Sequence, residues 1–128
     1  MRSVLILILV FLLFMSSSCS HIKKLAWAVA TNPYKKDKLS PDRGRKVYQK
    51  NCLSCHGENA DGKGDVAKTL KVHPAHLVND AKEHSDSVFA AHVAYGKSGS
   101  DEMPSFAEIL SEKEIWDVTN YIYSLVKK

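Results

Sequence analysis

The sequence predicts an all-α fold, with three to five short helices packed around one core. Three segments combine a helix-capping residue with apolar positions at helical spacing: residues 40–51, 85–95 and 111–126. No stretch shows the period-two alternation and turn residues that mark a β-hairpin. At 128 residues, the chain has room for one domain of ordinary size.

The first helix is predicted over residues 40–51. Ser40 is the expected N-cap, and Pro41 follows at the first helical position, where its missing N–H costs nothing. Gly44 lies in the helix interior, where glycine is about 1 kcal/mol less favourable than alanine. We therefore expect another element to cross the helix closely at Gly44, with Tyr48 pointing inward.

The middle of the chain is predicted to be mostly irregular. Residues 57–64 contain three glycines and no apolar periodicity, which indicates a flexible polar loop. Residues 66–72 predict a short helix that ends before Pro74, because the residue preceding a proline is driven to extended geometry.

Two capped helices complete the predicted fold. Residues 85–95 begin with the N-cap Ser85 and end before Gly96. Their inward face is expected to hold Val88, Ala91, His92 and Tyr95. Residues 111–126 begin with a capping box formed by Ser111 and Glu114. Their inward face is expected to hold Ile115, Val118, Tyr121, Ile122 and Leu125.

The chemistry of the chain is concentrated in the segment Cys52-Leu53-Ser54-Cys55-His56. Each thiol can add across a vinyl group of haem, and the imidazole that follows is then directed at the iron. This spacing is the signature of c-type haem attachment. Because a core of this size is marginal by buried area alone, one covalently held haem c per chain would fill much of it.

Two other interpretations of the cysteine pair remain open at this stage. A thioredoxin-like redox couple requires a βαβ context, and no run of β-branched strand residues precedes the motif. Half of a zinc site requires a second pair of ligands. The sequence offers Cys19 with His73 and His76 for that purpose.

The N-terminus predicts export. Arg2 precedes an apolar run over residues 4–15 and then three serines, so residues 1–18 are expected to be a signal peptide. The run is about a dozen residues, whereas a membrane-spanning helix needs roughly 20. Cys19 lies where the acylated cysteine of a bacterial lipoprotein would lie. A large aliphatic residue is expected three positions before that cysteine, and this sequence has Ser16 instead. The alternative is an ordinary signal cleaved nearby, with Cys19 incidental.

Residues 19–38 are predicted to be a lipid-anchored basic tether. We expect a loosely ordered linker, with docking of residues 25–29 on the domain or at the bilayer interface as the alternative. Residues 23–50 carry nine Lys or Arg against two Asp, a net charge of +7, and the rest of the chain from residue 51 carries −4. Such a segment would attract anionic head groups by about 1 kcal/mol per charge, or would act simply as a solvated linker. The basic residues have no interleaved aromatic platform, so no nucleic-acid partner is implied.

Taken together, the order of these parts resembles the class I cytochrome c family. The shared parts are an N-terminal helix, Cys-x-x-Cys-His, a glycine-rich loop, a proline, a Met-Pro pair and a C-terminal helix with an aromatic residue. The resemblance covers residues 39–126. It implies a cytochrome c domain over residues 39–128, with its short helices wrapped around the covalently bound haem.

The resemblance also implies roles for individual residues. Cys52 and Cys55 are similar to the thioether attachment points, His56 to the proximal iron ligand and Met103 to the distal ligand. Pro74 is similar to the proline whose carbonyl supports the proximal histidine.

Two further points follow from the resemblance. Gly44 and Tyr48 are expected to pack against the last helix, with Tyr121 as the partner. The alternative candidates for the distal iron position are His73, His76, His84 and His92.

Iron held by His56 and Met103 has no open position for a substrate, so the resemblance implies an electron carrier and not an enzyme. It would pass single electrons between a redox donor and acceptor in a respiratory or other periplasmic chain. We expect a monomer that makes small, transient contacts on the periplasmic side of a bacterial membrane. Two alternatives are a haem sensor or peroxidase-like enzyme with an open distal site, and an electron-transfer subunit of a larger oxidoreductase complex.

Overall fold

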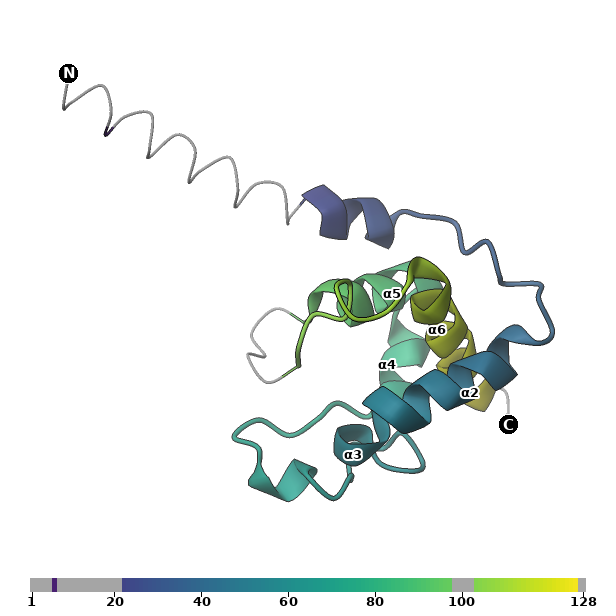
Figure 1. Cartoon of the computed structure of the whole chain (residues 1–128). Helices are drawn as coiled ribbons and strands as arrows, with labels where there is room; N and C mark the ends of the chain where they lie inside the picture. Colours follow the sequence, from purple (N-terminus) through teal and green to yellow (C-terminus); the bar gives the residue numbers. More distant parts are fainter. Residues whose placement is uncertain (1–5, 7–21, 98–102, 127–128) are drawn as a thin grey trace.

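The computed structural model describes residues 6, 22–97 and 103–126, and within them the chain is helical with no strand (Figure 1). Residues 22–28 form a first helix. The others are α2 (Ser40–Asn51), α3 (Leu53–His56), the 3-10 helix η1 (Ala67–Thr69), α4 (Leu77–Glu83), α5 (Asp86–Tyr95) and α6 (Glu112–Val126). The predicted all-α fold is confirmed. Cys19 and, apart from residue 6, the predicted signal peptide lie outside the described residues.

The core of the fold is the crossing of α2 and α6 (Figure 1). Gly44 lies at the crossing point, where a Cβ atom would collide with the carbonyl oxygen of Asp117. One turn further along α2, the ring of Tyr48 packs against that of Tyr121 with 5.4 Å between centroids. The expected close contact at Gly44, and its partner Tyr121, are therefore confirmed.

A buried carboxylate joins the same two helices. Asp117 of α6 accepts hydrogen bonds from the Ser40 hydroxyl (2.6 Å), from Arg43 (2.7 and 2.8 Å) and from Lys113 (2.8 Å). The prediction that Ser40 caps α2 is wrong, because Leu39 holds the N-cap position. The Ser40 side chain instead turns inward to the carboxylate of α6.

The helices after the haem motif agree only partly with the prediction. Ser85 caps α5 by accepting a hydrogen bond from the Val88 N–H, and the Ser111–Glu114 capping box starts α6. The predicted inward face of α5 is wrong, since Ala91 alone of its four members is buried. The buried residues of α5 surround most of the helix: Ser87, Phe89, Ala90, Ala91, Val93 and Ala94. Helix α4 was not predicted, and the expected helix over residues 66–72 is reduced to η1.

The segment before α2 folds back onto the domain, and we call residues 22–38 the N-terminal arm. Trp27 stacks on Trp116 of α6 with 5.2 Å between ring centroids. Asn32 is buried and donates a hydrogen bond of 2.8 Å to the side-chain oxygen of Asn120. The expectation of a loosely ordered linker is therefore wrong for this part of the chain, and the alternative of docking on the domain is confirmed.

None of the helices in the described part of the chain is both long enough and apolar enough to span a bilayer.

Substituting Gly44 tests the helix crossing. Alanine should favour the helix by about 1 kcal/mol, but its methyl group would collide with the backbone of α6. Because a collision with backbone is not relieved by rotating a side chain, we expect Gly44→Ala to lower the free energy of unfolding by about 2 kcal/mol. Guanidinium unfolding measures this, with Gln49→Ala at an exposed position of α2 as the control. Equal midpoints for the two variants would contradict the prediction.

Substituting Asp117 tests the buried carboxylate. Burial alone would raise the pKa of Asp117, but the hydrogen bonds from Arg43, Lys113 and Ser40 outweigh it and hold the pKa below its ordinary value. The carboxylate therefore stabilises the fold fully above the ordinary aspartate pKa of about 4, and this stabilisation is lost as the pH falls through the lower folded value.

We expect Asp117→Asn to cost about 2 kcal/mol at pH 7, and this difference from the unsubstituted protein should shrink below about pH 4. Urea unfolding over a pH series measures it. Asp42→Asn, at an exposed position of α2, is the control. A cost that stays constant down to the lowest pH would argue against an ionised, hydrogen-bonded Asp117.

Candidate cofactor site

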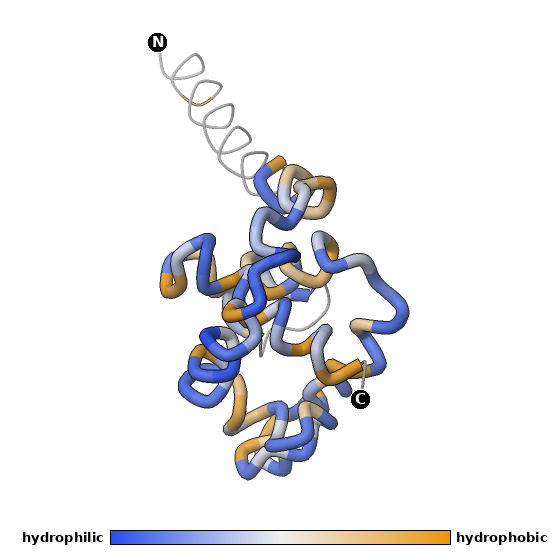
Figure 2. The backbone as a smooth tube through the Cα atoms, turned by 90° about the vertical axis from the view of Figure 1, so that its right-hand side faces the viewer, coloured by the Kyte–Doolittle hydropathy of each residue, from blue (hydrophilic) through white to orange (hydrophobic). Residues whose placement is uncertain are grey.

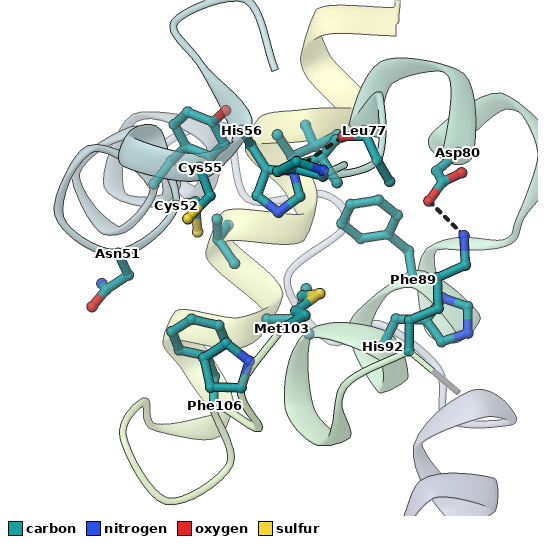
Figure 3. A pocket seen from close by; sticks show the side chains of 18 of the residues that line it. Asn51, Cys52, Cys55, His56, Leu77, Asp80, Phe89, His92, Met103 and Phe106 are labelled. Atoms are coloured by element: carbon teal, nitrogen blue, oxygen red, sulfur yellow. Dashed lines mark hydrogen bonds and ion pairs between the residues drawn. The ribbon is translucent and has the colours of Figure 1, made fainter. Parts of the chain in front are cut away.

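The end of α2 delivers the cysteine motif to the core. The backbone N–H of Cys52 donates to the carbonyl of Tyr48 at 2.8 Å, so Cys52 continues the last turn of α2. The single turn of α3 then carries Cys55 and His56. Figure 3 shows the two sulfur atoms side by side at the edge of a cavity, next to the ring of His56. The structure therefore brings together the three motif residues that the sequence predicted.

The cavity has a volume of about 410 Å³, which lies within the range of cofactor and small-molecule pockets. Its walls come from α2, α3, α4, α5, α6, the segment around Pro74 and the segment around Met103. Much of its lining is apolar, including Leu77, Phe89, Val93, Phe106, Val118 and Ile122. A flat, largely apolar group fits such a space, whereas a hydrated ion does not.

The imidazole of His56 is held by a backbone carbonyl. Its Nδ1 lies 3.1 Å from the carbonyl oxygen of Ala75. A carbonyl only accepts, so Nδ1 carries the hydrogen, and Nε2 of the neutral ring keeps its lone pair for a ligand. Burial lowers the pKa of His56, against a smaller opposite effect of the Ala75 hydrogen bond, and this favours the neutral ring. The expectation that the Pro74 carbonyl supports the ring is wrong: the structure places the supporting carbonyl one residue later, because the Pro74 carbonyl lies against Gly62.

The glycine-rich segment after the motif holds the motif in place. The N–H groups of Gly62, Gly64 and Val66 donate to the carbonyls of His56, Cys55 and Ser54, at 2.9, 3.1 and 3.0 Å. Gly62 has a φ of 80°, and a Cβ on Gly64 would collide with the Ser54 carbonyl. The predicted loop over residues 57–64 is confirmed as irregular structure, and its glycines are buried and allow the backbone to approach the motif closely.

Cys52 does not have the character of a reactive redox thiol. Burial, with a further contribution from Cys55, raises the pKa of Cys52 to about 12. Reactive Cys-x-x-Cys pairs work through a lowered thiol pKa, so this environment disfavours the thioredoxin-like interpretation. Among the residues that the structure describes, no group of three or more His, Cys, Asp or Glu could hold a metal ion. The zinc interpretation therefore also lacks its ligands in this part of the chain.

Met103 approaches the cavity from the wall opposite His56 (Figure 3). The segment that follows it is fixed to the end of α5. The Ser105 hydroxyl donates to the Ala94 carbonyl at 2.6 Å, and the Ala107 N–H donates to the same carbonyl at 2.9 Å. No local sequence pattern predicts this attachment, which depends on carbonyls left unpaired at a helix C-terminus.

The four alternative histidine candidates differ in whether they line the cavity. His73 and His92 line the cavity, and His76 and His84 are not among its lining residues. His84 packs edge-on against His92, with 5.5 Å between ring centroids. The sequence also missed an ion pair at the cavity wall, where the Lys97 ammonium lies 3.2 Å from the Asp80 carboxylate.

Comparison with known proteins places this site in a family. The family model described as cytochrome c oxidase, cbb3-type, subunit III matches residues 39–122. Cytochrome c550 of Pseudomonas aeruginosa is 30% identical over 95 residues, which are 73% of this chain and 61% of that protein. Cytochrome c6 of Leptolyngbya boryana is 33% identical over 87 residues, 66% of this chain and 92% of that protein.

Two larger proteins are also similar. The cbb3-type oxidase subunit CcoP of Azospirillum brasilense is 25% identical over 99 residues, 77% of this chain but 33% of that protein. A solved structure, the reducing HAO-like protein complex of Kuenenia stuttgartiensis, matches with a TM-score of 0.61 and 28% identity, over 70% of this chain and 44% of that one. The chain thus spans less than two thirds of the cytochrome c550 and about a third of CcoP.

The cavity and the comparisons agree on the cofactor. Two thiols at the cavity edge, an imidazole with a free Nε2 lone pair and apolar walls suit a covalently attached haem c. The family match extends from the start of α2 nearly to the end of α6, and so includes every wall of that cavity. The chain therefore belongs to the class I c-type cytochromes, in the family described as cytochrome c oxidase, cbb3-type, subunit III.

Proposed function

We propose that the protein is a one-electron carrier whose single haem c is ligated by His56 and Met103. One observation carries the proposal: the same apolar cavity holds both thiols, an imidazole fixed in the ligating tautomer and, on the opposite wall, the chain's one methionine outside the predicted signal. When bound, haem supplies an iron that exchanges single electrons, and a methionine ligand raises its reduction potential.

The chain's own residues would restrict the haem iron to electron transfer. Cys52 and Cys55 would fix the group by thioether bonds, and the Ala75 carbonyl would hold the His56 ring in one orientation. The apolar walls exclude water, which limits rearrangement when charge changes. With His56 and Met103 both holding the iron, no position for a substrate would remain, so we propose that the protein is not an enzyme.

A place in a larger complex is the second candidate. Its support is that two similar proteins are named as an oxidase subunit and as a complex. The peroxidase-like alternative has less support, because no arginine lines the described part of the cavity.

We further propose that residues 1–18 are an export signal and that Cys19 is the acylated N-terminus of the mature protein. The basis is the sequence order of Arg2, an apolar run, three serines and the cysteine. The tether of residues 19–38 would then join the membrane to the cytochrome domain of residues 39–128. The carrier would act on the periplasmic side as a monomer with transient redox partners.

Replacing Met103 tests the distal ligand. In Met103→Ala, the weak far-red ferric absorption band that reports sulfur ligation should disappear, and the reduced protein should bind carbon monoxide. The reduction potential should fall by roughly 0.2 V, a fraction of the range of about 0.8 V that axial ligands span. His73→Ala and His92→Ala, at the two cavity histidines, are the controls and should leave all three properties unchanged. Carbon monoxide binding by the unsubstituted protein would overturn the assignment and favour a sensor or enzyme.

Removing both thiols tests whether the haem completes the core. Without covalent haem, the cavity of about 410 Å³ would lack its filling. At about 24 cal/mol per Å³, the loss is on the order of 10 kcal/mol, comparable to the total stability of a small domain. We expect Cys52→Ala with Cys55→Ala to lose most of its helical signal in far-UV circular dichroism at room temperature. Ser54→Ala, within the same motif, should keep it. A fully helical double variant would show that the protein core alone suffices.

A further inference from the structure

The helix of the N-terminal arm exposes an apolar stripe. Ile22, Leu25 and Val29 are 67%, 66% and 75% exposed, and Ala26 between them is exposed as well. These positions follow the spacing i, i+3, i+4, i+7, which places them on one side of a helix. Figure 2 shows hydrophobic residues on this helix, at one end of the molecule.

The opposite side of the same helix is already used. Trp27 stacks on Trp116, and the Lys24 ammonium donates a hydrogen bond of 2.7 Å to the Gly96 carbonyl. Ala28 shares a shallow groove with Val88 and Ala91 of α5, and Leu25 of the stripe also lines that groove. The helix therefore has apolar residues on both sides, and the domain covers only the side that carries Trp27. Its two inner contacts prevent it from turning the stripe inward.

The cytochrome domain does not account for this helix, because the family match begins at residue 39. The whole arm is an addition to that domain and is basic. It carries five lysines against Asp37, a net charge of +4, and Asp37 is neutralised by Arg43 at 2.7 Å. Lys23, Lys36 and Lys38 are exposed. An apolar stripe on a basic segment is typical of a surface that lies on an acidic membrane.

We propose that Ile22, Leu25, Ala26 and Val29 form a membrane-contact surface that lies on a bilayer containing acidic phospholipids. The inference extends the proposed anchor at Cys19, since three residues of extended chain reach only about 10 Å and so hold Ile22 beside any acyl chain attached at Cys19. The apolar face of such a helix inserts about 5–10 Å into the head-group region. Side chains on the outer face of a helix that stays docked on the domain can reach this shallow depth.

The surface would set the orientation of the whole domain. The arm is fixed to α6 through Trp27 and Asn32, so the domain cannot rotate independently of the helix. In Figure 1 the arm helix lies at one end of the molecule and α3 at the other. The motif end of the domain would therefore face away from the membrane, toward soluble or protruding partners.

Hydroxyl-radical footprinting read by mass spectrometry tests the proposal on the full mature holoprotein. The protein is placed in vesicles of phosphatidylcholine with phosphatidylglycerol, and in vesicles of phosphatidylcholine alone. We expect oxidation of Ile22, Leu25 and Val29 to fall several-fold in the acidic vesicles, and the protection to weaken in high salt. Ile109, which is 60% exposed and belongs to the segment between α5 and α6, outside the arm, is the internal control and should be oxidised equally in both.

Two variants separate contact from misfolding. Leu25→Asp should abolish the protection of Ile22 and Val29, whereas Ile109→Asp should leave it intact. Both positions are exposed, and the visible spectrum of each sample confirms that the haem site is intact. That spectrum also keeps the two proposals apart, because loss of sulfur ligation counts against the carrier and not against the membrane contact.

Three results would overturn the proposal. One is equal oxidation of the stripe in both kinds of vesicle, and another is protection of Ile109 to the same degree. The third is protection that rises with protein concentration in the absence of lipid, which would assign the stripe to a second copy of the chain. A mature mass without an acyl group would remove the anchor at Cys19 and leave the footprint as the test of the surface.

Discussion

The close approach of α2 and α6 is the constraint on which the rest of the structure depends. It requires a position without a side chain, supplied by Gly44, and a carbonyl of α6 that fills the space. Once the two helices are in contact, Tyr48 is buried, and its hydroxyl donates to the Gly57 carbonyl at 2.6 Å. The bond from Tyr48 to Gly57 encloses the whole motif between its two ends. The crossing of α2 and α6 therefore determines where both thiols and His56 lie.

The second constraint is that the domain is built around a group that the chain itself does not supply. Its aromatic and aliphatic side chains line a cavity instead of filling the centre. The glycine-rich segment contributes by closing on the backbone of the motif, so that Ser54, Cys55 and His56 each have a bonded carbonyl. Covalent attachment suits this design, because a small domain with a large internal cavity has little stability to lose.

Local signals in the sequence sufficed for the motif, the Ser85 cap, the capping box of Ser111 and Glu114, and the helix crossing. The segment from Cys52 to His56 is recognised by its residue spacing alone. Gly44 indicates a close helix crossing, because glycine is otherwise unfavourable in a helix interior. The misses all involve contacts between distant segments. Ser40 looks like a cap until Asp117 of α6 competes for its hydroxyl, and α5 shows no clear inward face because it is covered on several sides. Helix α4 has seven residues and no side-chain cap, so it depends on burial of Leu77 and Ala81. The docking of the N-terminal arm depends on single distant partners such as Trp116 and Asn120, which local sequence does not identify.

The stacking of Trp27 on Trp116 also has a bearing on how the protein is made. The two rings are separated by almost the entire cytochrome domain in the chain, and the arm is synthesised first while α6 is synthesised last. The arm has nothing to pack against until the C-terminal helix has been released and has crossed α2. The entropy lost in closing so long a loop is offset only when the arm contacts a helix that has already formed. Its docking is consequently a late event, and a truncated or stalled chain would leave the arm undocked, with Trp27 exposed to proteases.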